Sequence, residues 1–375
     1  MSPQDGSASS RPPSADEAAV FERLERLAAT EGVAATLESL ATSLAEGGRW
    51  HAVFDVRLLE ARLSLGLPIS GDLGGVDRAT REKLDEASLA ACREAGWPLL
   101  EEGRPAAAWM YLRASAEPTE VAARLEGLLH REDLVDREEL RTEVMQLALW
   151  EGIDPALGLR LVIEDHGTCN AITAYMQAVA RLPAARRRPA ADVLVDHLHG
   201  ECIERGSHVD LSHLHNVLEI GRECTDPQRI AKALALAGYA RGMPEDLLMP
   251  GEPPFGELAI ASEHFFGAQL GEDPEAAVAY FSAQVEQAPG DPGPLEWLAI
   301  LLWRIGRAKE SLRMVLSRQP GSEGFATGIL PSIVDLAVAA DDLPAVLDAC
   351  RRWNDPVTFA TALAAHQNFK RLQKP

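Results

Sequence analysis

Three turn residues near the C-terminal end are separated by one fixed interval, and this interval constrains the fold more than any other feature of the sequence. Gly271, Gly306 and Asp341 each stand between two apolar, helix-forming segments, and neighbouring turns are 35 residues apart. A period in this range is typical of helical hairpins that stack on one another, because one hairpin alone cannot bury its apolar face. The sequence therefore predicts a stacked helical array at this end of the chain.

One of these hairpins resembles a tetratricopeptide repeat (TPR). In the stretch DPGPLEWLAILLWRIGRAKESLRMVL, Trp297 lies early in the first helix and Gly306 closes it. The stretch EAAVAYFSAQVEQAPGD resembles the second helix of such a repeat, with Phe281 inside it and Pro289 at its end. The resemblance covers residues 257–355, although the tyrosine usual after the glycine is absent. It implies a right-handed superhelix of antiparallel helix pairs whose concave face binds a peptide or another protein.

Helical spacing of apolar residues continues through the rest of the chain. Residues 39–66 and 81–118 each predict a helix, a glycine-containing turn and a second helix, and six further helices are expected between 137 and 241. Aromatic residues make up only 5% of the chain while Ala and Leu are abundant, a composition that favours helix over strand. We therefore expect an all-α fold, a superhelical array of antiparallel helix pairs. Its expected parts are a disordered tail (1–15), N-terminal helical hairpins (16–136), a central His-rich helical region (137–245) and C-terminal TPR-like repeats (246–375).

The charge of the chain narrows the range of partners. Its 57 acidic and 36 basic residues give a formal net charge of −21. So acidic a chain repels phosphate backbones and anionic lipids, so we expect neither nucleic acid nor membrane as a partner. The expected partner is a protein or peptide, and the charge would favour a basic one. The sequence does not indicate the oligomeric state.

The cysteines and the apolar segments predict a location. The chain has five cysteines with no C-x-x-C pair, and no apolar run reaches the roughly 18 residues of a membrane span. Its first residues also lack the basic start and apolar core of a secretory signal. We therefore expect reduced, mostly buried thiols in a cytoplasmic protein.

A histidine-rich stretch, VDHLHGECIERGSHVDLSHLHNVLEI (195–220), allows two interpretations. In the first, histidines from two or more helices converge on a divalent metal, as metal ligation requires. This interpretation uses His166, His197, His199 and His213. In the second, the histidines flank the core and pair with carboxylates four residues away, as His197 could with Glu201 and His215 with Glu219. None of the recognised zinc spacings is present, and both interpretations stay open.

A stripe of polar side chains marks the helix expected after Gly167. The stripe consists of Asn170, Thr173, Gln177 and Arg181, and it lies opposite Ile172, Tyr175, Met176 and Val179. Uncharged polar residues are atypical of a solvent-facing surface in so acidic a protein. Amide side chains can bind the backbone of an extended peptide, a common use of the concave face in TPR-like proteins. A polar contact between two helices is the alternative explanation.

Two functional hypotheses follow. The first is a non-catalytic TPR-like scaffold that binds a peptide or protein with the polar stripe. The second is a metal-binding protein or metal-dependent enzyme that uses the histidines. The sequence has no P-loop, no G-x-S-x-G and no H-E-x-x-H motif, which disfavours several common enzyme classes. A run of three arginines, Arg186 to Arg188, is expected either to begin a helix in solvent or to receive an acidic segment or a phosphate.

Overall fold

The computed structural model describes residues 15–69, 73–134, 136–207, 209–243, 256–289, 291–317 and 328–372. Within these ranges all regular structure is helical and no strand occurs, which confirms the all-α prediction. No helix in the described ranges is long and apolar enough to cross a membrane. All five cysteines are free, and three of them are buried. The expected N-terminal tail, apart from Ala15, lies outside the described residues.

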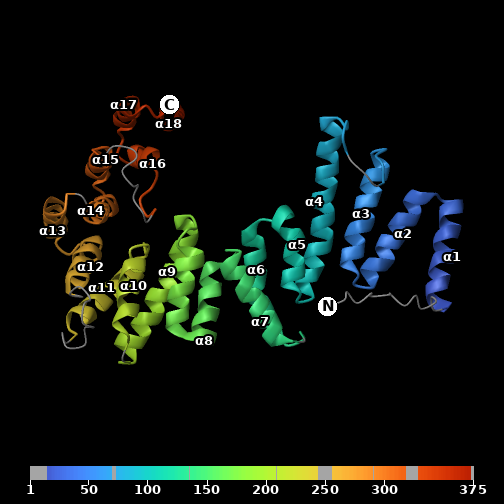
Figure 1. Cartoon of the computed structure of the whole chain (residues 1–375), viewed down its shortest axis with the longest axis horizontal. Coiled ribbons are helices and arrows are strands. Elements are labelled where there is room, and N and C mark those ends of the chain that lie inside the picture. The colour runs from blue at the N-terminus through green and yellow to red at the C-terminus, as the bar shows by residue number, and fades with distance from the viewer. Residues whose placement is uncertain are drawn as a thin grey trace, which may run out of the picture. The chain divides into compact units, whose positions relative to one another are not determined.

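The chain divides into two compact units, residues 1–147 and 148–375. In the first unit, successive helices pack on one another in chain order (Figure 1). These helices are α1 (Ala15–Thr30), α2 (Val33–Glu46), α3 (Trp50–Ser64), α4 (Arg78–Glu101), α5 (Pro105–Ser115), α6 (Pro118–Leu129) and α7 (Arg137–Met145). The π-helical turn η1 (Gln146–Trp150) lies at the boundary.

An ion-pair network ties three helices of the first unit together. Arg57 on α3 contacts Glu38 of α2, lies 2.8 Å from Glu60 of its own helix and 2.9 Å from Glu94 of α4. A guanidinium group can serve several carboxylates because its five N–H groups point in fixed, separate directions. Arg57 therefore links α2, α3 and α4 through ion pairs.

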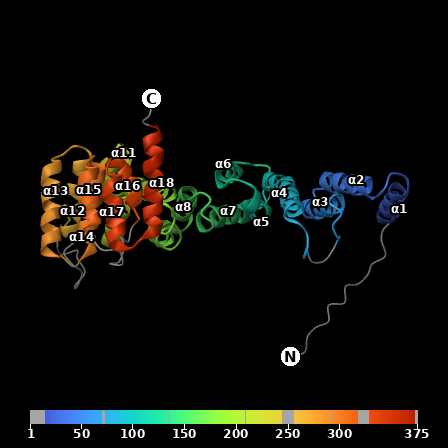
Figure 2. The same ribbon diagram turned by 90° about the horizontal axis from the view of Figure 1, so that it is seen from above.

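The second unit contains the remaining helices, and Figure 2 shows α12 to α18 alongside one another. Its elements are α8 (Pro155–Ala174), η2 (Tyr175–Val179), α9 (Ala184–His199), η3 (Gly200–Glu204), α10 (Leu211–Gly221), α11 (Pro227–Arg241), α12 (Gly256–Gln269), α13 (Pro274–Gln287), α14 (Pro292–Arg304), α15 (Ala308–Leu316), α16 (Ile333–Ala339), α17 (Leu343–Trp353) and α18 (Pro356–Leu372).

Several of these helices begin at an Asp-Pro step. The aspartate side chain accepts a hydrogen bond from a backbone N–H of the first turn, as Asp226 does from Gln228 and Arg229. Asp154, Asp273 and Asp291 do the same at the starts of α8, α13 and α14. Proline fits the next position because its fixed φ is helical and its missing N–H would have had no partner there.

The three turns at Gly271, Gly306 and Asp341 share one backbone geometry. Their φ angles are all positive, at 91°, 81° and 52°. In each turn, the next residue donates its N–H to the carbonyl oxygen five residues back, over 2.8, 2.7 and 2.9 Å respectively. This is the Schellman motif, which ends a helix and reverses the chain. The 35-residue interval thus corresponds to three helical hairpins, α12–α13, α14–α15 and α16–α17, that turn in the same way.

Aromatic side chains fill the contacts between the first two of these hairpins. Trp297 of α14 is 8% exposed and stacks on Phe281 of α13, with ring centroids 5.6 Å apart. Phe265 of α12 packs against the same indole in a T-shaped arrangement with ring centroids 5.0 Å apart, and the Arg222 guanidinium lies 4.3 Å from the indole centre. The tryptophan that carries the TPR resemblance is therefore a packing residue.

Candidate functional site

Gly167 divides α8 into two helical segments. Its φ of 80° and ψ of 176° are not helical, a conformation that glycine adopts readily because it has no side chain. The first segment precedes Gly167, and the second continues through η2. The predicted break at Gly167 is therefore present. The helices that follow one another here fall into two alternating sets. One set comprises the segment before Gly167, α9 and α11, and the other comprises the segment after Gly167 and α10.

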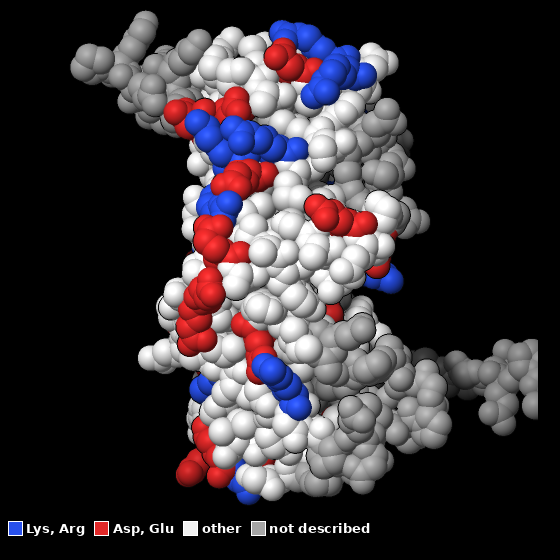
Figure 3. Space-filling model, turned by 90° about the vertical axis from the view of Figure 1, so that its left-hand side faces the viewer, with Lys and Arg blue, Asp and Glu red and all other residues white. Residues whose placement is uncertain are grey.

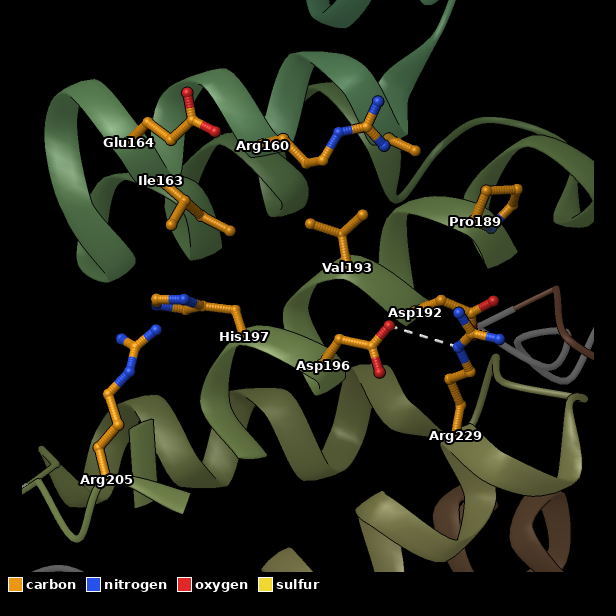
Figure 4. Close-up of a pocket in the computed structure, with 11 residues that line it drawn as sticks. Arg160, Ile163, Glu164, Pro189, Asp192, Val193, Asp196, His197, Arg205 and Arg229 are labelled. Carbon is orange, nitrogen blue, oxygen red and sulfur yellow. Dashed lines mark hydrogen bonds and ion pairs between the residues drawn. The ribbon is translucent and has the colours of Figure 1, made fainter. Parts of the chain in front are cut away.

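A groove of about 650 Å³ lies over the first of these sets, the segment of α8 before Gly167, α9 and α11 (Figure 4). It is lined by Ala156, Arg160, Ile163 and Glu164 from α8, by Pro189, Asp192, Val193, Asp196 and His197 from α9, by Arg205 after η3, and by Arg229 from α11. On both α8 and α9 the lining positions recur every three or four residues, so each helix presents one face. In Figure 4 the two faces run side by side in the same direction, with Ile163 and Val193 between the charged side chains.

The charges in the groove are mixed and mostly paired. Arg229 Nε lies 3.3 Å from Asp196 Oδ2, and Lys232 Nζ lies 2.6 Å from Asp196 Oδ1, which ties α11 to α9. Arg205 contacts Glu201. Burial raises the pKa of the Asp192 carboxyl above its ordinary value. The lining residues comprise three arginines and three carboxylates, so the groove itself has no strong preference for one sign of charge.

His197 projects into the groove from a half-buried position (Figure 4). Its Nε2 atom lies 2.8 Å from the Thr168 hydroxyl, directly after the break at Gly167. Burial lowers the pKa of the imidazole below its ordinary value, and the Glu201 carboxylate only partly opposes this effect. A neutral imidazole has one donor and one acceptor, so the Nδ1 atom can form a hydrogen bond with a ligand in the groove.

The four histidines of the metal hypothesis do not form a cluster. Within the described ranges no group of three or more His, Cys, Asp or Glu side chains is placed to hold a metal ion. His166 is exposed, His197 contacts Thr168, and His199 Nδ1 lies 3.3 Å from Glu204 Oε1 on the turn that follows its own helix. His213 is half-buried on α10.

The expected polar stripe exists and faces outward. Asn170, Thr173, Gln177 and Arg181 are all exposed. The Asn170 amide and the Thr173 hydroxyl donate to backbone carbonyls four residues back, those of His166 and Cys169. The stripe lies on the segment after Gly167, which does not line the groove. On the face opposite the stripe, Ile172, Tyr175 and Val179 are buried, whereas Met176 is 54% exposed.

Arginines contact two of the carboxylates in the histidine-rich stretch, and another arginine nearby is buried. Glu201 contacts Arg205, and Glu219 contacts Arg222. An arginine is always charged and can bind a carboxylate through two N–H groups. Arg187, in the run expected to begin a helix in solvent, is only 5% exposed.

The groove was not identified from the sequence, although its signal is present there. Polar and apolar residues at 156, 160, 163 and 164 repeat with helical spacing, as do those at 189, 192, 193, 196 and 197. In the sequence, each of these two groups of positions is typical of the edge of a helix face, between the buried core and the solvent. Only the packing of α8 against α9 makes the two boundaries into one concave surface.

Comparison with known proteins adds no relative. No family model matches the chain, and neither a curated protein nor a solved structure matches it.

Proposed function

We propose that this chain is a non-catalytic, TPR-like helical scaffold that binds an extended peptide segment of a partner protein in the groove over α8, α9 and α11. The observation that supports this proposal most strongly is the alternation of the lining helices. In an array of helical hairpins, every second helix faces the same side, and that side is the usual binding surface. The groove is therefore where such an array would hold its ligand.

The chemistry of the groove suits a peptide. Ala156, Ile163 and Val193 offer an apolar floor for one or two anchoring side chains. Arginines and carboxylates both stand beside that floor, a mixture that suits peptide side chains of either charge. His197 suits a backbone amide, because a neutral imidazole matches either an N–H or a C=O group.

The whole chain would add an electrostatic preference to this local recognition. A net charge of −21 attracts a basic partner over a distance set by the ionic strength. On the face of the second unit in Figure 3, acidic and basic side chains alternate along one edge beside a broad uncharged area. The proposed partner is thus a basic protein that presents an extended segment, and we place the complex in the cytoplasm.

The test is a selection of peptides from a random library against the full chain, followed by binding measurements with two variants. Val193→Arg places a long charged side chain on the groove floor. The matched control is Val338→Arg, at an exposed position on α16 of the same unit. The selected peptides should share a sequence pattern and bind the control as they bind the wild type. Val193→Arg should lower the affinity of these peptides at least about tenfold, equivalent to ~1.4 kcal/mol of binding free energy.

The proposal fails if the selected peptides share no pattern, or if they bind Val193→Arg as tightly as the wild type. Either result would show that this surface is not the binding site.

A further inference from the structure

A second cluster of charged side chains is buried in the same unit, where the start of α9 meets the ends of α10 and α14. Arg187 and Glu223 are its centre, and both side chains are only 6% exposed. Arg187 Nε donates to Glu223 Oε1 over 2.7 Å, and Arg187 Nη1 donates to the Leu182 carbonyl oxygen over 2.8 Å. The pair is therefore fixed in place from two sides.

Two further arginines lie beside this pair. Arg304 Nη2 donates to the Glu223 backbone carbonyl oxygen over 3.5 Å, and the charges of Arg188 and Arg304 both act on the Glu223 carboxyl. Burial, together with the neighbouring charge of Arg188, lowers the pKa of Arg304 to about 10. Arg304 nevertheless stays protonated at neutral pH. Three positive charges thus surround one carboxylate, an imbalance that a buried site normally relieves by pairing.

Several polar atoms of the cluster lack a partner. Glu223 Oε2, Arg188 Nε and Arg304 Nε are buried, and none of them makes a hydrogen bond within the part of the chain that the structure describes. Native proteins leave few such atoms unpaired, and each one calls for an explanation. Here two unused donors and one unused acceptor stand in a cluster with excess positive charge.

We propose that this cluster binds a phosphate group, either free inorganic phosphate or the phosphate of a small phosphomonoester. The phosphate oxygens would accept hydrogen bonds from Arg188 and Arg304, and its negative charge would balance their excess. Slightly below neutral pH a part of the phosphate molecules still carries a proton, since the second pKa of a phosphomonoester is about 6. That proton would be donated to Glu223 Oε2.

A pocket borders the cluster on the side of Arg187 and Glu223. It has a volume of about 310 Å³, and its wall includes Arg187, Glu223, Tyr175 and Arg222. The pocket lies between η2, α10 and the start of α9, and it shares no lining residue with the peptide groove. The phosphate site is therefore distinct from the proposed peptide site and does not depend on it.

The test is calorimetric titration of the full chain, slightly below neutral pH, with inorganic phosphate, glycerol phosphate and sulfate in parallel. Phosphate should bind, and sulfate should bind at least about tenfold more weakly, because it has no proton to donate to Glu223. If glycerol phosphate binds more tightly than inorganic phosphate, the ligand is a phosphomonoester. If inorganic phosphate binds and glycerol phosphate does not, the ligand is the free ion.

Two variants and a control locate the site. Arg188→Gln should weaken phosphate binding about tenfold or more. Arg186→Gln is the matched control, since this neighbouring guanidinium lies beside Gly152 instead. Glu223→Gln should reduce the difference between the affinities for phosphate and for sulfate, because an amide can donate a hydrogen bond to either anion. If that variant does not fold, two other results test the proposal: the ratio of the wild-type affinities for phosphate and sulfate, and the effect of Arg188→Gln on phosphate binding.

The proposal is overturned if neither phosphate nor glycerol phosphate binds, if sulfate binds equally well, or if Arg186→Gln and Arg188→Gln have the same effect.

Discussion

His197 connects the break in α8 to the groove. It contacts Thr168 across 2.8 Å, immediately after the non-helical Gly167, and it lines the groove from α9. The contact fixes the ring, and the same burial that fixes it makes the charged form unfavourable. A single side chain thus links the local bend of one helix to the chemistry of the binding surface.

This placement predicts a pH dependence of stability. The folded-state pKa of His197 is lowered, so the unfolded chain takes up a proton more readily than the folded one. The free energy of unfolding should therefore fall as the pH drops below the unfolded value of about 6.5. Urea unfolding at several pH values should show that His197→Gln removes part of this loss. The matched control is His166→Gln, at an exposed position. Equal pH dependence in the wild type and in His197→Gln would contradict the account.

The hairpin turns show what can be predicted from sequence at the level of an element. Gly271 and Gly306 could be identified because few residues other than glycine tolerate a positive φ. Asp341 was identified by its position in the 35-residue interval, and it too has a positive φ. The helices between these turns follow from the spacing of their apolar residues. Local geometry of this kind depends on neighbouring residues alone, so the sequence contains it.

The turns also predict the effect of a substitution. Gly306 has a φ of 81°, and a methyl group added there would meet no atom within 4 Å. Gly306→Ala should therefore lower the free energy of unfolding by ~1–2 kcal/mol through backbone strain alone. Gly238→Ala, inside α11, is the control, because its new methyl group would make only an ordinary contact with Glu263 at 3.8 Å. That variant should be as stable as the wild type or more so, by up to ~1 kcal/mol. Denaturant unfolding measures both, and equal losses would show that the turn geometry at Gly306 is not what matters.

At the scale of the whole molecule, the sites depend on contacts that the sequence does not display. The sequence left open whether Arg187 is solvated or paired, because its partner, Glu223, is 36 residues away in the turn after α10. The groove required the packing of α8 against α9, and its arginines and aspartates looked like ordinary surface residues. The metal hypothesis rested on the number of histidines in one stretch. Among the described residues, however, no three potential ligands lie close enough together to hold a metal ion. Composition and apolar spacing therefore predicted the all-α class, whereas the candidate sites required the structure.

The division into two compact units makes the location of binding testable. The proposed peptide groove and the proposed phosphate cluster both lie within residues 148–375. The first unit, by contrast, contains neither of them. Binding of a groove ligand should accordingly leave α1 to α5 unaffected.

The most direct test of the central claim is amide hydrogen exchange of the full chain with and without a peptide selected as described above. The account predicts slower exchange in the first segment of α8 and in α9, around residues 156–164 and 189–197, with no change in α1 to α5. Slower exchange confined to other helices, or no change in α8 and α9 at a saturating peptide concentration, would contradict it.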